Sequence, residues 1–143
     1  MNAEKQYAFD KQQRYDKAYL RMAKLSHCTR KQVGALIVKE GMIISDGYNG
    51  TPSGYPNACE DDKGDTLWYV LHAEANAILK VARSTHNAKG ATLYLTLSPC
   101  KECSKLILQA GIVRVVFMKA YKDQSGVEFL VNSGVEVLQL EEI

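Results

Sequence analysis

The stretch ATLYLTLSPCKECSKLILQA, residues 91–110, decides much of the fold, because two kinds of element meet in it. The apolar run that opens it is typical of a buried strand, and the part after Pro99 has the pattern of a helix. Proline suits the first turn of a helix, with Ser98 as a candidate N-cap. Cys100 and Cys103 stand one helical turn apart, so both thiols can point the same way. Metal sites and redox sites both use such a pair.

Length and composition describe an ordinary globular chain. The 143 residues are enough for one domain with a real core, which we place at residues 1–143. The 18 basic and 16 acidic residues leave a net charge of +2, which argues weakly against an extended nucleic-acid face. Residues 1–17 are polar and charged, so we read them as neither a signal peptide nor a membrane anchor. We therefore expect a cytoplasmic protein.

The four cysteines are Cys28, Cys59, Cys100 and Cys103. Without a secretion signal, we expect them to lie in a reducing compartment, where disulfides are uncommon. Metal binding or catalysis is then the better first hypothesis for their use.

The order of the expected elements indicates an α/β fold. Two strands form a hairpin, a long loop rich in Gly, Pro, Asn and Asp follows, and strands then alternate with helices, which implies parallel pairing. We expect a three-layer α/β/α sandwich around a five-stranded mixed sheet. The expected helices are 5–25, 72–83, 100–110 and 127–133, the expected strands are 33–38, 42–48, 91–97, 113–118 and 135–140, and the loop is 49–65. In the second helix, Ala75, Ile78, Leu79 and Ala82 share one face.

Two thiolates do not fill a zinc site, so a further ligand is needed. His72 begins its helix as Cys100 begins the next, and Glu74 follows two residues later. One imidazole and two thiolates leave a fourth tetrahedral position open, which is the pattern of a catalytic zinc. The donors can converge only if two helix N-termini face a common point. Glu74 suits a general acid/base beside a zinc-activated water better than a fourth ligand.

A redox dithiol of the thioredoxin type is the alternative for Cys100 and Cys103, since that dithiol also lies at a helix start. Such proteins need a later proline beside the dithiol, and no proline follows Pro99. This alternative also leaves His72 and Glu74 without a role.

The residues His72-Ala73-Glu74 and Pro99-Cys100-Lys101-Glu102-Cys103 match the H-x-E…P-C-x-x-C signature of zinc deaminases. Together, SHCTRKQVGALIV, GYNGTPSG, HAEANAIL and SPCKECSKLI resemble the deoxycytidylate (dCMP) deaminases of the cytidine deaminase superfamily, over about residues 15–140. The resemblance implies a cytidine deaminase-like fold, one catalytic Zn²⁺ and hydrolytic deamination of dCMP to dUMP. It also implies that Glu74 protonates N3 of the base and then the departing ammonia.

The resemblance extends to substrate contacts. It implies that Asn49 binds the sugar hydroxyl, although an Asn-Gly pair is also a common turn. It implies that the backbone near Ala73 and Ser98 positions the edge of the base. Tyr121 and Arg30 are candidates for the substrate phosphate, and Arg30 could equally be a surface residue.

The resemblance further implies regulation, with dCTP activating and dTTP inhibiting at a separate site. The expected contacts of that site are Gly50, Ser53, Gly54 and Asn76, and a Mg²⁺ could accompany the triphosphate. It also implies a homohexamer.

Because the signature is shared across the superfamily, deamination of another cytosine or purine substrate, as nucleoside or polynucleotide, stays open. An inactive zinc scaffold is a further alternative, against which the intact Glu74 argues.

Cys28 and Cys59 remain outside the signature. Some dCMP deaminases that this chain resembles carry a second, structural zinc, with ligands in the long loop and just before the H-A-E motif. Residues 61–71 here contain neither Cys nor His. We therefore expect no second zinc and two free thiols. Whether His27, which lies near Cys28, has a role stays undecided. We expect His86 to be a solvated surface residue.

Overall fold

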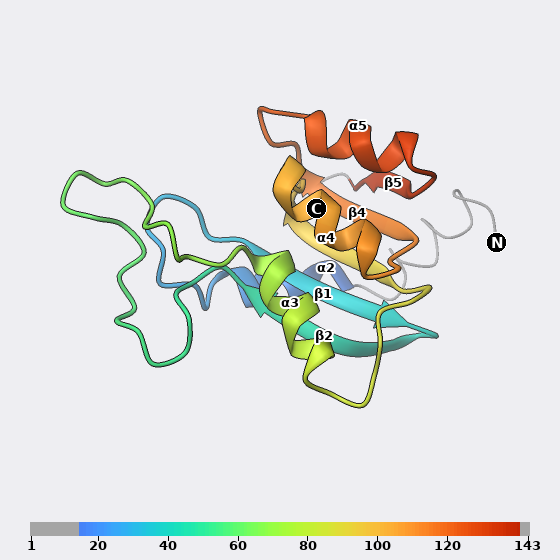
Figure 1. Ribbon diagram of the computed structural model, residues 1–143, viewed down its shortest axis with the longest axis horizontal. Helices are drawn as coiled ribbons and strands as arrows, with labels where there is room; N and C mark the ends of the chain where they lie inside the picture. Colours follow the sequence, from blue (N-terminus) through green and yellow to red (C-terminus); the bar gives the residue numbers. More distant parts are fainter. Residues whose placement is uncertain (1–14, 141–143) are drawn as a thin grey trace.

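The computed structural model describes residues 15–140 and is built on one five-stranded sheet with the strand order β2-β1-β3-β4-β5 (Figure 1). The strand β1 is antiparallel to both of its neighbours, β2 and β3, whereas β3, β4 and β5 are parallel to one another. The predicted mixed sheet is therefore confirmed. Its strands are β1 Gly34–Lys39, β2 Met42–Tyr48, β3 Thr92–Leu97, β4 Arg114–Lys119 and β5 Glu136–Gln139.

Helices cover both faces of the sheet, which gives the predicted three layers. The helix α2 packs on one face against β1 and β3, and α3, α4 and α5 lie on the other (Figure 1). The described helices are α2 Tyr15–Ala23, α3 Ala73–Ala82, α4 Lys101–Gln109 and α5 Ser125–Asn132. Residues 5–14 of the predicted first helix lie outside the described residues. Across residues 15–140, none of the helices has the length and apolar character that crossing a bilayer requires.

The sheet separates two apolar clusters, because side chains of a strand alternate between its faces. Ala35, Ile37, Leu93, Leu95, Val115 and Phe117 face α3, α4 and α5. Leu36, Val38, Tyr94, Val116 and Met118 face α2. The central strands are thus buried on both sides, as their continuous apolar runs predict.

The apolar face that the sequence marks on α3 lies only partly in the core. Leu79 and Ala82 are exposed, and the sheet is contacted instead by Ala73, Ala77 and Val81. The reason is a close approach to β2 at Gly47, where an added Cβ would lie 2.5 Å from the carbonyl oxygen of Ala73. Only small side chains fit between the helix and the strand there, so the alanines face inward.

The strand directions bring two helix N-termini to one edge of the sheet. Both β2 and β3 are antiparallel to β1, which lies between them, so they run the same way. The chain enters α3 after β2 and enters α4 after β3. Both helices therefore begin beyond the carboxyl ends of these strands, where α/β folds bind their ligands.

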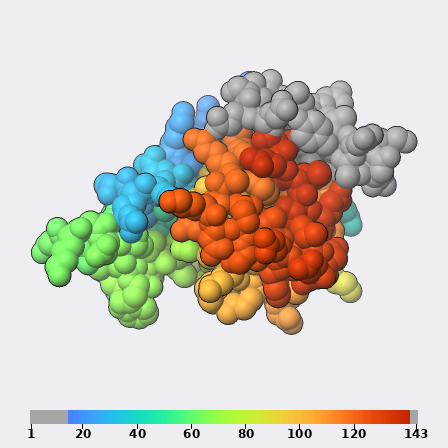
Figure 2. All heavy atoms as spheres, turned by 90° about the horizontal axis from the view of Figure 1, so that it is seen from above, coloured from blue at the N-terminus to red at the C-terminus, as the bar shows by residue number. Residues whose placement is uncertain are grey.

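The segment 49–72 between β2 and α3 projects from the body of the fold (Figures 1 and 2). At its base, the backbones of Gly50 and Leu71 exchange two hydrogen bonds, of 3.0 and 2.8 Å. Trp68, which is 92% exposed, meets the ring of Tyr69 edge-on at 5.7 Å. The predicted loop is confirmed and runs beyond residue 65, because the only regular pairing within it is isolated bridges.

Candidate metal centre and active site

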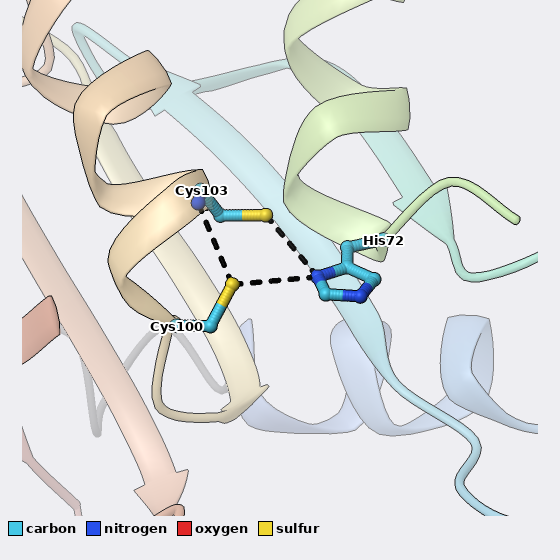
Figure 3. A group of neighbouring side chains, drawn as sticks. All are labelled: His72, Cys100 and Cys103. Carbon is cyan, nitrogen blue, oxygen red and sulfur yellow. Dashed lines mark hydrogen bonds between the residues drawn. The ribbon is translucent and has the colours of Figure 1, made fainter. Parts of the chain in front are cut away.

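Three side chains of the predicted signature converge between the tips of α3 and α4 (Figure 3). His72 is the N-cap residue of α3, Cys100 is the N-cap residue of α4, and Cys103 lies in the first turn of α4. The Nδ1 atom of His72 is 3.6 Å from the Sγ atom of Cys100 and 3.3 Å from that of Cys103. The structure therefore brings these three side chains together at two helix N-termini, the arrangement that the sequence predicts.

The donor set fits a zinc ion. In a tetrahedral site, zinc–sulfur bonds of about 2.3 Å and zinc–nitrogen bonds of about 2.0–2.1 Å place the nitrogen and sulfur atoms roughly 3.5 Å apart. The observed separations of 3.6 and 3.3 Å lie on either side of that value. Three protein donors leave one tetrahedral position for water or substrate, as catalytic zinc sites do.

Hydrogen bonds prepare one thiolate in this cluster. The backbone N–H of Cys103 donates to the Sγ atom of Cys100 at 3.5 Å. Hydrogen bonds from the Cys103 side chain and from His72 lower the pKa of Cys100 to about 4. Sharing that proton raises the pKa of Cys103, and the hydrogen bond to Cys100 raises the pKa of His72. Before metal binds, the cluster therefore holds the Cys100 thiolate beside a proton-retaining imidazole and thiol.

These pKa directions predict how zinc affinity changes with pH. Binding requires a neutral imidazole and two thiolates. Below the raised pKa of His72 and above pH of about 4, zinc displaces one proton from His72 and one from Cys103. The association constant should rise about a hundredfold per pH unit there and about tenfold per unit above the pKa of His72. Competition with a chromophoric chelator between mildly acidic and alkaline pH measures both slopes. A tenfold slope throughout would show that His72 is already neutral in the metal-free protein.

Glu74 lies in the first turn of α3, beside the three donors, and only 4% of it is exposed. Burial disfavours the charged carboxylate and raises the pKa of Glu74, while the nearby imidazole of His72 partly opposes this effect. A carboxyl group with a raised pKa next to a metal-activated water can both accept and return a proton near neutral pH.

Ser98 does not cap α4, and this prediction was wrong. Cys100 occupies the N-cap position instead, so the helix begins two residues later than a Ser98 cap requires. The hydroxyl of Ser98 accepts a hydrogen bond from the backbone N–H of Tyr121 at 2.6 Å, and its own N–H donates to the carbonyl of Lys119 at 2.9 Å. Ser98 therefore ties the end of β3 to the loop after β4.

The first turn of α4 is held from behind by α5. A Cβ atom added to Gly126 would lie 2.5 Å from the carbonyl oxygen of Pro99 and 2.7 Å from the carbonyl carbon of Cys100. The hydroxyl of Ser104 also lies there and donates to the carbonyl of Cys100 at 2.8 Å. Since backbone cannot move aside like a flexible side chain, only glycine leaves Cys100 in place.

The change Gly126→Ala should therefore weaken zinc binding as well as folding. We expect the free energy of unfolding to fall by about 1–3 kcal/mol, as in other overpacked sites. Zinc affinity should fall about tenfold or more, because mutations of the residues that orient a metal ligand commonly lower metal affinity by that factor. Chemical denaturation and zinc competition measure the two effects. Gly50→Ala is the matched control, since its added methyl group meets nothing within 4 Å. An unchanged zinc affinity in the Gly126 variant would contradict this role.

A cavity of about 200 Å³ leads to the metal centre from the surface. Several of its lining residues were predicted from the sequence, namely Arg30, Asn49, His72, Ala73, Glu74, Ser98, Cys100 and Tyr121. Lys31 also lines the cavity and was missed, although the basic pair Arg30-Lys31 offered a signal. Its Nζ atom lies 4.1 Å from the centroid of the Tyr121 ring. The cavity is therefore lined both by metal-ligating side chains and by two cationic side chains.

Asn49 joins two parts of the cavity wall. Its side-chain oxygen accepts a hydrogen bond from the N–H of Val33 at 2.8 Å, and its side-chain nitrogen donates to the carbonyl of Lys31 at 2.8 Å. The turn alternative for this residue thus has some support, since the amide fixes the local backbone. The same amide lines the cavity, so the expected sugar contact stays a prediction.

The residues expected to bind effectors are not among those that line the cavity. Ser53 and Gly54 are exposed on the loop, and Gly54 has a φ of 91°, which glycine adopts without strain. The side chain of Asn76 donates to the carbonyl of Tyr48 at 2.8 Å, and Gly50 pairs with Leu71. The four residues therefore flank the base of the loop and its exposed part rather than the metal centre.

Cys28 and Cys59 form a disulfide, so the expectation of free thiols was wrong. The two residues are 31 positions apart, but the loop folds back and brings their Cα atoms to 5.1 Å. Cys100 and Cys103 are not part of any disulfide. Among the described histidines, His86 is exposed as predicted, and His27 is exposed beside the buried Cys28.

Comparisons with known proteins agree with this geometry. The sequence profile described as the cytidine and deoxycytidylate deaminase zinc-binding region matches residues 9–119. The deoxycytidylate deaminase of Enterobacteria phage T4 is 36% identical, with 86% of each chain covered. The human deoxycytidylate deaminase is 44% identical over 67% of this chain, which spans 57% of that relative. The crystal structure of dCMP deaminase from the cyanophage S-TIM5, in complex with dCMP and dUMP, superposes with a TM-score of 0.87 at 41% identity, covering 98% and 99% of the two chains.

Proposed function

Because this chain belongs to the cytidine and deoxycytidylate deaminase family of zinc enzymes, we propose that it deaminates dCMP to dUMP by hydrolysis. The observation that carries the proposal is the cavity itself. It joins the His72–Cys100–Cys103 cluster and the buried Glu74 to a wall that contains Arg30 and Lys31. This arrangement suits a cytosine ring at the metal end and an anionic phosphate at the basic end. The similar cyanophage enzyme was crystallised with dCMP and dUMP.

The chain supplies the proton transfers. Zinc held by the three donors would activate a water molecule for attack on C4 of the cytosine ring. Glu74 accepts a proton from that water and delivers it to N3. It then takes the remaining proton of the attacking oxygen and passes it to the amino group, which leaves as ammonia while the C4 carbonyl forms. Water and cytosine are thereby converted to uracil and ammonia. The raised pKa of Glu74, caused by its burial, suits both directions of transfer.

The wall residues position the rest of the nucleotide. In this proposal, the backbone at Ala73 and Ser98 meets the edge of the base, and Asn49 meets the sugar hydroxyl. Arg30, Lys31 and Tyr121 meet the phosphate. The position of the Lys31 ammonium over the Tyr121 ring supports this grouping, because it gathers both side chains on one side of the cavity.

Ammonia release from dCMP, deoxycytidine, dCTP and a cytosine-containing oligonucleotide tests the proposal. We expect dCMP to be turned over with the highest kcat/KM. Turnover of only the nucleoside or the oligonucleotide would leave the zinc chemistry in place and refute dCMP as the substrate. Turnover of none of the four would refute the proposed reaction.

The changes Arg30→Ala and Lys31→Ala should each raise the KM for dCMP about 10- to 150-fold, because a charge-assisted contact to phosphate contributes about 1.5–3 kcal/mol. The KM for deoxycytidine, which has no phosphate, should change by less than about twofold. The control variant Lys24→Ala removes an exposed cation that does not line the cavity. An equal rise in KM for dCMP and deoxycytidine would show that these residues maintain the structure of the cavity wall and do not bind the phosphate.

We also propose that dCTP activates and dTTP inhibits the enzyme through Gly50, Ser53, Gly54 and Asn76, with Mg²⁺ accompanying the triphosphate. Exposure of Ser53 and Gly54 outside the cavity lining supports a second nucleotide site.

We further propose a single-domain, cytoplasmic protein that assembles as a homohexamer. Met42 and Ile43 on β2 and Leu79 on α3 are exposed apolar side chains that assembly would cover. Turnover with each triphosphate, and the mass of the purified protein in solution, test these proposals.

A further inference from the structure

The Cys28–Cys59 disulfide joins two segments that together form the wall of the cavity. One segment follows α2 and contributes Cys28, Arg30 and Lys31 to the lining. The other belongs to the projecting loop and contributes Glu60, Thr66 and Val70. The two segments run side by side, with the light-blue chain after α2 against the green loop in Figure 2. The covalent link thus joins two separate segments of the cavity wall.

A second contact reinforces the link one residue further along each segment. The backbone N–H of Thr29 donates to the carboxylate of Glu60 at 2.6 Å, and the hydroxyl of Thr29 donates to the same carboxylate. These hydrogen bonds lower the pKa of Glu60, so the carboxylate is ionised at neutral pH. Arg30 and Lys31 follow Thr29 directly, and the side chain of Asn49 holds the carbonyl of Lys31. The basic pair is therefore fixed from Cys28 on one side and from Asn49 on the other.

We infer that the Cys28–Cys59 disulfide is a positioning crosslink that holds Arg30 and Lys31 at the substrate entrance, and that its reduction weakens nucleotide binding while the metal centre keeps its chemistry. The inference rests on the proposed function for the nature of the substrate. The zinc donors are a separate pair of cysteines, Cys100 and Cys103, which stay outside the disulfide. The disulfide acts together with the Thr29–Glu60 hydrogen bonds and the Asn49 side chain. Opening it removes the one covalent anchor of the Arg30–Lys31 segment, so the free segment samples more conformations, and nucleotide binding must exclude them.

The redox step is thiol–disulfide exchange. A thiolate of a dithiol reductant attacks one sulfur atom of the link, the bond between Cys28 and Cys59 breaks, and a mixed disulfide forms. The second thiol of the reductant then displaces the protein cysteine, so the reductant is oxidised to its own disulfide and the protein gains two thiols. Because Cys28 is 5% and Cys59 is 2% exposed, the reductant reaches the bond only when the two segments separate. Bound nucleotide should therefore slow the reduction.

The first measurement is peptide mapping of the zinc-loaded protein by mass spectrometry, after alkylation without reduction. We expect a linked peptide that contains Cys28 and Cys59. Alkylation of both cysteines in the purified protein, or their retention of a second zinc ion as thiolates, would overturn the inference. This measurement does not use dCMP, so it does not depend on the proposed function.

The second measurement compares kinetics before and after reduction by a trialkylphosphine, which becomes the phosphine oxide by taking oxygen from water. With zinc content unchanged, we expect the KM for dCMP to rise about tenfold and kcat to change by less than about twofold. The double variant Cys28→Ser/Cys59→Ser should show the high KM with and without phosphine. An equal KM in the oxidised and reduced proteins would overturn the inference.

Hydrogen exchange gives a readout that needs no substrate and no variant. In the reduced protein, the amide of Thr29 and those of residues 30–31 should exchange faster than in the oxidised protein, while the amides of α4 should not change. If dCMP is not a substrate but this difference is present, the proposed function fails and the positioning role stands. If exchange at residues 29–31 is the same in both states, the positioning role fails.

Discussion

The change Glu74→Gln is expected to lower kcat about a thousandfold or more while the protein keeps its zinc. The amide has nearly the same size as the carboxyl group and fills the same buried position in the first turn of α3. It cannot accept a proton from water or return one to the base, and proton transfer by a positioned side chain commonly contributes about 10²–10⁴-fold. Steady-state ammonia release and metal analysis of the same sample measure the two properties together.

The matched control is Glu102→Gln, which makes the same chemical change at an exposed site on α4. Glu102 pairs with Lys105 at 2.7 Å on the surface, where an ion pair contributes little. The kcat of the Glu102→Gln variant should stay within about twofold of that of the unchanged protein. If Glu74→Gln retains more than about a tenth of the activity with zinc present, another group must carry the protons.

The largest expected effect on the metal comes from Cys103→Ala. This change removes one of three protein donors, so we expect the zinc to be lost on dialysis against a weak chelator, together with all measurable turnover. Cys103 is 4% exposed, and its thiol lies 3.3 Å from the Nδ1 atom of His72. Elemental analysis of the dialysed protein gives the zinc content per chain.

Two comparisons separate metal loss from general damage. The unchanged protein, stripped of zinc by a strong chelator, should regain activity when zinc is added, whereas the Cys103 variant should not. Lys105→Ala, an exposed change on the same helix, should keep its zinc. One zinc ion per chain in dialysed Cys103→Ala would contradict the three-donor site.

The sequence alone predicts the sheet and the metal centre well, for one physical reason. Cys100 follows β3 closely, whereas His72 follows the long loop after β2. Each begins a helix, so their side chains lie at helix tips before any contact is known. The hairpin turn between β1 and β2 then makes β2 run parallel to β3, and the two tips meet at one edge. Local patterns and strand direction together determine this part of the molecule.

Other features depend on contacts that a pattern does not contain. Helical periodicity marks an apolar face of α3. It does not reveal that Gly47 lets the helix approach β2 closely, and this approach turns Leu79 outward. Likewise, Ser98 is a good N-cap by type, yet its hydroxyl is used by the N–H of Tyr121. The pairing of Cys28 with Cys59 depends on the path of a long loop, whereas our expectation rested on the redox state of a compartment.

Trp68 gives this protein a built-in optical reporter. It is the only tryptophan in the chain, and it lies on the projecting loop between the disulfide and the first metal ligand. At 92% exposure, its indole should emit at the long wavelengths of a ring in water. A partner subunit or a nucleotide that covers the loop should shift this emission to shorter wavelengths, without any label. Stopped-flow fluorescence could therefore time the movement of the loop separately from the release of ammonia.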